Sequence, residues 1–448
     1  DEVERATDLF RHVMHTVQLA SDDAVNVPFG PFETMMFGSG TAEQRAWCVA
    51  CLLRQLRVPT IILELSEGSS DSAGKDAVDS ADVVETPVIL GVLIKGNVYL
   101  FDAARGLPVP GVDDNRTDAL ITRPLTLSEA VSDDSLLRRF DGDPAHPWPV
   151  TADQLRNARV LITGDSTLWS RRMEAMQNAI SGAASAIVFE PLIGYGAFDA
   201  EEGAAGFVTG RVNKILPESK VDIWSVPETL REARELLTDE QMAVIAQFDQ
   251  LLSSPQPMSV QKLKEPNVDG RTFTVSFGSG WKTLRKARTN QVLCKNSRAI
   301  RDFVRVQGWK DEAPLENDTE RSSLPPSAEL MAVIPPEILE QGQQAAERAQ
   351  FWRAACQLQK RLGLEMRTDS EDEPASTDAS TSEGFVTYLR QYPDGTFKNY
   401  AFFLAAVSMA SEGHTGRAAG YLDGITRDAP EYPAARYLIQ RWSETDKN

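Results

Sequence analysis

The feature that most restricts the possible folds of this chain is the stretch "GTAEQRAWCVACLLRQLRVPTIILEL", residues 40–65. Thr41 followed three residues later by Gln44 forms a capping box, which predicts that a helix begins at Thr41. Residues 46–53 are all apolar or cysteine, and a helix that is apolar on every side belongs in the interior of a domain. Pro59 ends the helix, and the β-branched run after it predicts a strand. The sequence therefore predicts a buried central helix that packs against a sheet.

The predicted helix, Thr41–Leu56, is followed by two further strand-like segments beyond residues 60–65. "PVILGVLI" (87–94) and "VYLFD" (98–102) flank the turn "KGN", a pattern typical of a β-hairpin. Together the three segments predict an antiparallel sheet. We therefore expect an α+β fold in which residues 1–135 form an N-terminal domain with the helix at its centre.

The rest of the chain divides into three regions by pattern. Residues 136–255 alternate helical and strand-like segments, among them the predicted strands "SAIVFE" and "KVDIWSV", and we expect a small α/β domain. Residues 256–335 are mixed and loop-rich. Residues 336–448 are helical, but their segment 366–384 is acidic and poor in apolar side chains, which predicts a flexible loop between helices.

The composition limits the kinds of partner. The 448 residues carry a formal net charge of −19, which repels nucleic acid and anionic lipid, so we expect no nucleic-acid partner. No apolar run is long enough to cross a bilayer, so we expect no integral membrane segment. Lysine and arginine concentrate at residues 282–310. This pattern indicates either a solvated helix face or a docking surface for an acidic partner.

Histidine and cysteine, which carry much of enzyme chemistry, are scarce, with four of each in the chain. His12 and His15 lie near the apolar stripe of a predicted N-terminal helix, without cysteine or acidic partners at the spacing of metal ligands, so we interpret them as structural. The glycine-rich segment 192–210 lacks the spacing of a phosphate-binding loop. We expect neither a metal nor a cofactor.

The cysteines have three interpretations. Cys48 and Cys51 lie in the helix predicted to be buried, where burial raises the pKa of a thiol and makes it unreactive, so packing is the first interpretation. A disulfide or metal role with Cys294 or Cys356 is the second, and catalysis is the third. Four cysteines are too few for a disulfide scaffold.

The capped helix, its motif Leu52-Leu53-Arg54 and the strand and hairpin after it resemble the core of the transglutaminase-like (papain-related) superfamily. In that superfamily a catalytic cysteine opens the central helix about ten residues before the Leu-Leu-Arg, a histidine begins a later strand and an aspartate ends the next one. The segments "GTAEQRAW", "GLPVPG", "HPWPVT" and "SRRM" are also similar to transglutaminase-like domain proteins of planctomycetes. The resemblance implies a cysteine, histidine and aspartate triad for acyl transfer.

This chain departs from the family pattern at two of the three catalytic positions. The resemblance places the nucleophile at Ala42 and the histidine at Pro87, and it keeps only the aspartate, Asp102. Thr41 and Asp102 are the residues that the resemblance assigns to the cleft. The fold signature is therefore present, while the catalytic machinery is incomplete.

The last 50 or so residues resemble a tetratricopeptide repeat, with Gly413 at a turn, Ala418 and Leu422 on the following helix and Pro430 at its end. The resemblance implies binding of a protein or peptide. A single repeat cannot bury its own apolar face, so we expect it to pack on the long helix that begins at Pro336 or on a partner.

Two functions follow as hypotheses. The first is a non-catalytic protein-binding or scaffolding protein, built on a degenerate transglutaminase-like domain and a helical repeat tail. The alternative is an amide-processing hydrolase or acyl-transfer enzyme whose active site is relocated, with Asp102 or a thiol from elsewhere. The acidic composition, the degenerate repeat and a first residue that is not methionine favour the cell envelope or periplasm, with the cytoplasm as the alternative.

Overall fold

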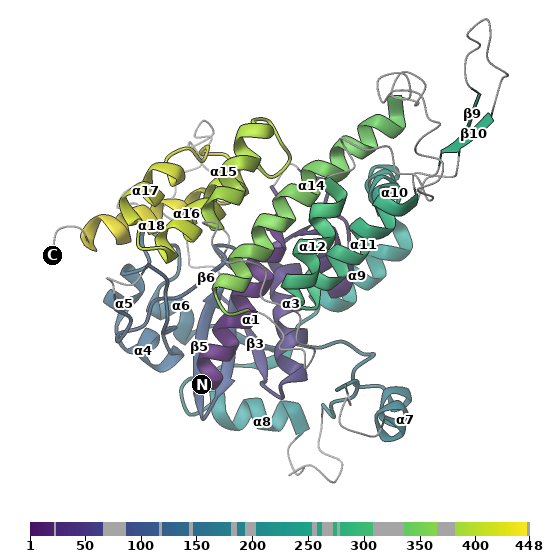
Figure 1. Ribbon diagram of the computed structural model, residues 1–448. Helices are drawn as coiled ribbons and strands as arrows, with labels where there is room; N and C mark the ends of the chain where they lie inside the picture. Colours follow the sequence, from purple (N-terminus) through teal and green to yellow (C-terminus); the bar gives the residue numbers. More distant parts are fainter. Residues whose placement is uncertain are drawn as a thin grey trace, which may run out of the picture. The chain divides into compact units, whose positions relative to one another are not determined.

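The computed structural model mixes helices and strands (Figure 1). By its internal contacts the chain forms two compact units: unit 1 contains Asp1–Leu237 and Met409–Asn448, and unit 2 contains Thr238–Ser408. In the part of the chain that is described, no helix is long and apolar enough to cross a membrane. The structure describes residues 1–21, 24–65, 87–115, 119–142, 147–180, 186–192, 203–252, 258–261, 272–275, 278–307, 336–364 and 381–445.

Unit 1 is built on a six-stranded sheet with the strand order β6-β5-β4-β3-β7-β8. Neighbouring strands are antiparallel, except that β7 and β8 are parallel. The predicted α+β class and the three predicted N-terminal strands are confirmed. The strands are β3 (Thr60–Glu64), β4 (Ile89–Ile94), β5 (Asn97–Asp102), β6 (Leu107–Pro108), β7 (Arg159–Ile162) and β8 (Val221–Ile223).

The predicted central helix is α3 (Ala42–Gln55), with Thr41 as its cap. The Thr41 hydroxyl accepts a hydrogen bond from the Gln44 backbone N–H at 3.3 Å, and the Gln44 side-chain oxygen accepts one from the Thr41 N–H at 2.9 Å. Leu53 is fully buried. The helices α1 (Glu2–Thr16) and α2 (Pro31–Phe37) pack against α3, and α1 and α3 lie beside the sheet (Figure 1). The buried helix against a sheet is thus confirmed.

The region 136–255 is not a separate small domain. Strand β7 pairs with β3 over four residue pairs, from Ile61↔Ile162 to Glu64↔Arg159, so the N-terminal sheet continues into this region. The predicted boundary after residue 135 is wrong because the pairing partner of β7 lies about a hundred residues earlier in the chain, beyond the reach of local patterns. The remaining helices before Thr238 are α4 (Leu127–Ser132), α5 (Asp134–Arg138), α6 (Ala152–Arg156), α7 (Arg171–Ala179), α8 (Gly203–Val212), α9 (Val226–Ala233) and the 3₁₀ turn Arg234–Leu236.

One predicted strand is absent. Ala186–Glu190, within "SAIVFE", is irregular. The main-chain groups of this segment bond to glutamine side chains instead of to a neighbouring strand: Gln55 bonds Ile187, and Gln177 bonds Ala186 and Val188. The β-branched composition predicts a strand, but this segment does not pair with an edge strand of the sheet.

The C-terminal helices have the predicted order. α16 (Lys398–Ser411) ends in a turn at Gly413, whose φ of +85° favours glycine, and α17 (Thr415–Leu422) and α18 (Tyr432–Thr445) follow. Helix α18 packs within unit 1. Its Tyr437 ring packs on Phe140 of unit 1, with ring centroids 4.8 Å apart.

Unit 2 is mainly helical. The rings of Phe351 and Phe397 stack 4.3 Å apart in its core, and the fully buried Arg288 guanidinium lies 4.4 Å from the Trp352 ring centroid. The basic segment is therefore solvated only in part, with Lys282 exposed and Arg288 in the core. The elements are α10 (Asp239–Leu252), β9 (Met258–Gln261), β10 (Thr272–Val275), α11 (Gly278–Val292), α12 (Asn296–Gln307), α14 (Pro336–Arg361), α15 (Thr381–Gln391) and most of α16.

The predicted flexible loop 366–384 is too long at its C-terminal end. Helix α15 begins at Thr381, whose hydroxyl lies 2.5 Å from the Ser408 hydroxyl, and both residues are buried. Gly384 lies so close to α14 that an added Cβ would be 2.9 Å from the Ala354 Cβ. These tertiary contacts order residues whose local composition favours a loop. Residues 366–380 lie outside the described part of the chain.

Candidate functional site

The first turn of α3 is the position at which the family resemblance places a nucleophile. Ala42 is 9% exposed there. The Gln44 side-chain N–H groups donate to the carbonyl oxygens of Val27 at 2.7 Å and Phe29 at 3.3 Å. An added Cβ on Gly40 would lie 2.8 Å from the Thr34 methyl carbon. The preceding segment is therefore packed closely against the capped end of the helix.

The end of β5 lies next to this turn. Ile89, the first residue of β4, pairs with Asp102, and the Ala103 N–H donates to the Val88 carbonyl at 2.9 Å. Pro87 therefore precedes β4 at the same end of the sheet at which β5 ends with Asp102. The Arg45 guanidinium, in the first turn of α3, donates to the Ala104 carbonyl at 3.4 Å. The Arg45 side chain thus links the first turn of α3 to the turn after β5.

Asp102 itself is committed to structural hydrogen bonds. Its Oδ1 accepts from the backbone N–H groups of Ala104 at 2.9 Å and Arg105 at 3.2 Å. Its Oδ2 accepts from the Trp148 indole N–H at 2.9 Å. Both side chains are buried, Asp102 to 0% and Trp148 to 1% exposure. Asp102 therefore does not line an exposed cleft, and Thr41 uses its hydroxyl in the helix cap.

The two thiols of α3 are poor nucleophiles. Cys48 is buried and its Sγ donates to the Pro31 carbonyl at 3.4 Å. Burial is the main cause that raises the pKa of Cys48 well above its ordinary value. Burial also raises the pKa of Cys51, although Arg54 acts in the opposite direction. All four cysteines lie in the described part of the chain, and none forms a disulfide there.

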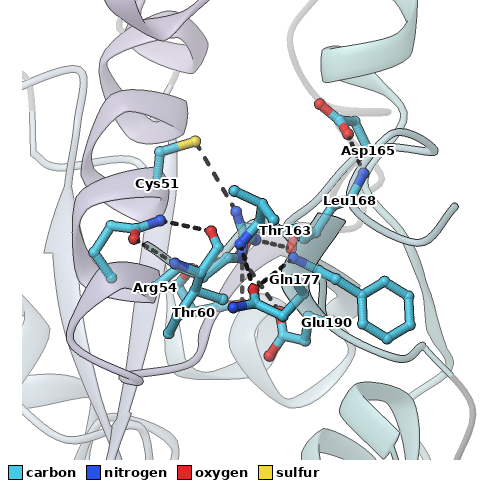
Figure 2. A network of polar contacts seen from close by, with 12 residues as sticks. Cys51, Arg54, Thr60, Thr163, Asp165, Leu168, Gln177 and Glu190 are labelled. Carbon is cyan, nitrogen blue, oxygen red and sulfur yellow. Dashed lines mark hydrogen bonds and ion pairs between the residues drawn. The ribbon is translucent and has the colours of Figure 1, made fainter. Parts of the chain in front are cut away.

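A polar network that the sequence analysis missed surrounds the C-terminal half of α3 (Figure 2). Arg54 donates to the Glu190 carboxylate at 3.2 Å and to the Thr163 carbonyl at 2.6 Å. The hydroxyls of Thr60 and Thr163 are 2.6 Å apart. Arg54, in the Leu-Leu-Arg motif, therefore ties the helix to the ends of β3 and β7. Its position in that motif was the available sequence signal, but no local pattern points to Thr163 or Glu190.

A second missed cluster interacts electrostatically with Arg45 in the first turn of α3, and it contains titratable side chains. Glu431, directly before α18, is 6% exposed, and its Oε1 accepts from the Gln18 side-chain N–H at 3.4 Å. Burial raises the pKa of Glu431 to about 7, while Arg45 acts to lower it. Burial lowers the pKa of His15 to about 3, with Arg11, His12 and Arg45 acting in the same direction. A lone glutamate after Pro430 carries no motif that could reveal it.

The described part of the chain contains no candidate metal site. There, histidine, cysteine, aspartate and glutamate do not form a group of three or more that could hold a metal ion. His12 and His15 are both buried in α1, and His414 is exposed at the start of α17. His146 lies outside the described residues.

The comparisons with known proteins add no identification: no family model, no curated protein and no solved structure matches the chain. A functional assignment therefore depends on the residues and on the geometry of the first turn of α3.

We predict that the Asp102–Trp148 hydrogen bond stabilises unit 1. Asp102→Asn turns one acceptor of the buried side chain into a donor, and Trp148→Phe removes the indole donor from the buried carboxylate. Each change should therefore lower the free energy of unfolding by about 1–3 kcal/mol. The measurement is hydrogen exchange of the β5 amides. The double variant should lose less than the sum of the single losses, because both changes remove the same bond.

The matched control for this cycle is Asp153→Asn. Asp153 forms an ion pair with Arg156 while its side chain stays 84% exposed, so the loss should stay below about 0.5 kcal/mol. Strictly additive losses at Asp102 and Trp148 would contradict the coupling.

A second prediction concerns pH. The pKa of His15 is about 3 in the folded chain and about 6.5 when unfolded, so the unfolded state binds more protons between these values. His15 therefore makes stability rise with pH across that window, by up to about 1.4 kcal/mol per pH unit. The raised pKa of Glu431 acts in the opposite direction between about 4.5 and 7.

Hydrogen exchange of the α1 amides from pH 5 to 6.5 tests this sign. The stability of wild type minus that of His15→Gln should increase with pH, because the variant lacks the contribution of His15. The exposed His414→Gln is the control and should track wild type. A difference that stays constant would exclude the lowered His15 pKa.

Proposed function

We propose that the chain is a non-catalytic protein-binding or scaffolding protein, built on a degenerate transglutaminase-like domain and a helical repeat tail. One observation carries the non-catalytic part: Asp102 keeps the residue type of the family aspartate, but its Oδ2 accepts a hydrogen bond from Trp148. In a catalytic triad the aspartate orients an imidazole, which takes and returns protons. An indole N–H only donates a hydrogen bond and cannot act as a base.

The thiol chemistry supports the same proposal. A nucleophilic thiolate needs a lowered pKa, such as a helix N-terminus provides. Ala42 holds that position in α3. Cys48 and Cys51 lie further along the helix, and burial raises the pKa of both. The hydrolase or acyl-transfer alternative therefore lacks a reactive thiol in this helix.

The binding part of the proposal draws on the C-terminal helices. α16, α17 and α18 follow one another with a tight turn at Gly413, the arrangement that the tetratricopeptide resemblance implies. Repeats of this kind bind proteins and peptides rather than catalyse. A protein or peptide is therefore the partner that we propose.

Thiol labelling tests the non-catalytic part. Folded wild type treated with iodoacetamide should stay unlabelled at Cys48 and Cys51, because Cys48 is buried and Cys51 only partly exposed, and the pKa of both thiols is raised. Ala42→Cys should create a labelled thiol whose pKa lies below the ordinary value of about 8.5, since the helix N-terminus favours the thiolate. Mass spectrometry of the labelled peptides across pH 6 to 10 measures both effects.

Ala175→Cys is the control for this titration, because Ala175 is exposed in the middle of α7 and should give a thiol of ordinary pKa. Rapid labelling of native Cys48 or Cys51 in the folded chain would shift the assignment to the enzyme alternative.

Peptide selection tests the binding part. Random peptides displayed on phage and selected on the intact chain should converge on one motif. The chosen peptide should bind reversibly, be recovered uncleaved and protect amides of α16–α18 from hydrogen exchange. Cleavage of the peptide, covalent attachment to the chain, or a footprint confined to other elements would refute the proposed function.

A further inference from the structure

Glu431 is a buried carboxyl with too few hydrogen-bond donors for its charged form. It directly precedes α18, and its backbone carbonyl accepts from the Ala435 N–H at 2.9 Å. Its Oε1 has the long contact with Gln18 described above, and its Oε2 is buried without a hydrogen-bond partner. An ionised carboxylate in such a place loses its hydration without replacement, so the neutral acid is favoured.

The charged and titratable groups around Glu431 come from several elements. From β1 (Gln18–Leu19) comes Gln18, which is neutral, and from α3 comes Arg45, the cation that acts on the carboxyl. His15 and His12 of α1 are coupled electrostatically to each other, and His15 to Arg45 as well. On its own segment, Asp428 is exposed. The carboxyl therefore lies where the C-terminal segment meets the first turn of α3.

The other end of α18 is held by a buried ion pair and by a hydrogen bond of its indole. The Arg441 guanidinium lies 2.8 Å from the Asp114 carboxylate, and both side chains are fully buried. The Trp442 indole N–H donates to the Ala119 carbonyl at 3.1 Å. The backbone of α18 comes so close to Gly142 that an added Cβ there would be 2.5 Å from the Tyr437 nitrogen. The helix covers a surface within residues 114–142.

We propose that Glu431 is a proton-controlled latch. The segment 430–445 docks on the rest of unit 1 when the Glu431 carboxyl is protonated, and deprotonation of this carboxyl favours release of the segment. Release would expose the first turn of α3 and the surface that α18 covers. The latch does not depend on the proposed function, because it concerns the docking of one helix and not the partner.

The direction and the size of the pH effect on docking follow from proton linkage. Burial raises the pKa of Glu431 from 4.5 to about 7 in the docked state, and a released, solvated glutamate has its ordinary pKa. Docking then takes up a proton between these values. The docking equilibrium should fall about tenfold per pH unit over this window, roughly 300-fold in total, and should level off above it.

Hydrogen exchange of the intact chain between pH 5 and 8 tests the latch. Protection factors, corrected for intrinsic exchange, should fall by about two orders of magnitude for the α18 amides relative to the α3 amides of the same unit. Glu431→Gln keeps the shape of the side chain and cannot ionise, so its α18 protection should stay level across this range. The control Asp428→Asn removes an exposed carboxylate three residues away and should behave as wild type.

Ala434→Cys provides a readout that leaves Glu431 unchanged, because Ala434 lies on α18 and is buried. The labelling rate of the introduced thiol, divided by its thiolate fraction, should rise with pH in parallel with the loss of α18 protection. If Glu431→Gln fails to fold, this labelling rate alone tests the latch. Three results would each overturn the latch: wild-type α18 protection that does not change with pH, a Glu431→Gln variant with the wild-type pH dependence, or a constant corrected labelling rate.

Discussion

The hydrogen bond between the Trp148 indole and the Asp102 carboxylate links the sheet of unit 1 to the surface on which the C-terminal helix packs. A buried carboxylate requires donors, and those of Asp102 include two backbone N–H groups of the turn after β5 and the indole. The indole ring in turn packs edge-on against Phe140, with centroids 4.8 Å apart. Phe140 also contacts Tyr437 of α18. The Asp102 carboxylate at the end of β5 therefore holds the turn after that strand and the Trp148 indole in place. The indole in turn packs on Phe140, on which α18 packs.

The same bond gives this aspartate a different role from the one that the resemblance implies. The resemblance implies that an aspartate at this sheet edge orients a histidine, and here an aspartate at that edge orients an indole. The geometric demand on the carboxylate is similar in both cases: it accepts one N–H from a ring and satisfies its other oxygen locally. The chemical difference lies in the ring, because an imidazole exchanges protons near neutral pH and an indole does not. Stability alone can therefore account for Asp102.

The sequence predicted the elements whose determinants are local. The capping box at Thr41 and Gln44 and the hairpin around Lys95–Asn97 depend on residues within a few positions of one another, and both regions were predicted correctly. The pairing of β7 with β3 depends on contacts across about a hundred residues, so the continuous sheet was missed. Thr381 begins a helix because α14 and α16 pack against it. Glu431 has no motif, and only the docking of α18 makes it a buried acid.

Glu431 and His15 flank Arg45, and their protonation determines how this buried cation is balanced. With its pKa lowered to about 3, His15 is neutral at neutral pH, which avoids a second positive charge beside Arg45. Glu431 is the group that can supply a negative charge there, and Arg45 acts to lower its pKa against the larger effect of burial. Attraction and desolvation therefore compete at one carboxyl, and a pKa raised to about 7 shows that desolvation is the larger effect. At the far end of α18, the buried side chains of Arg441 and Asp114 form an ion pair. Glu431 thus makes one end of α18 respond to pH, so a change of pH should loosen the segment first at its junction with α3.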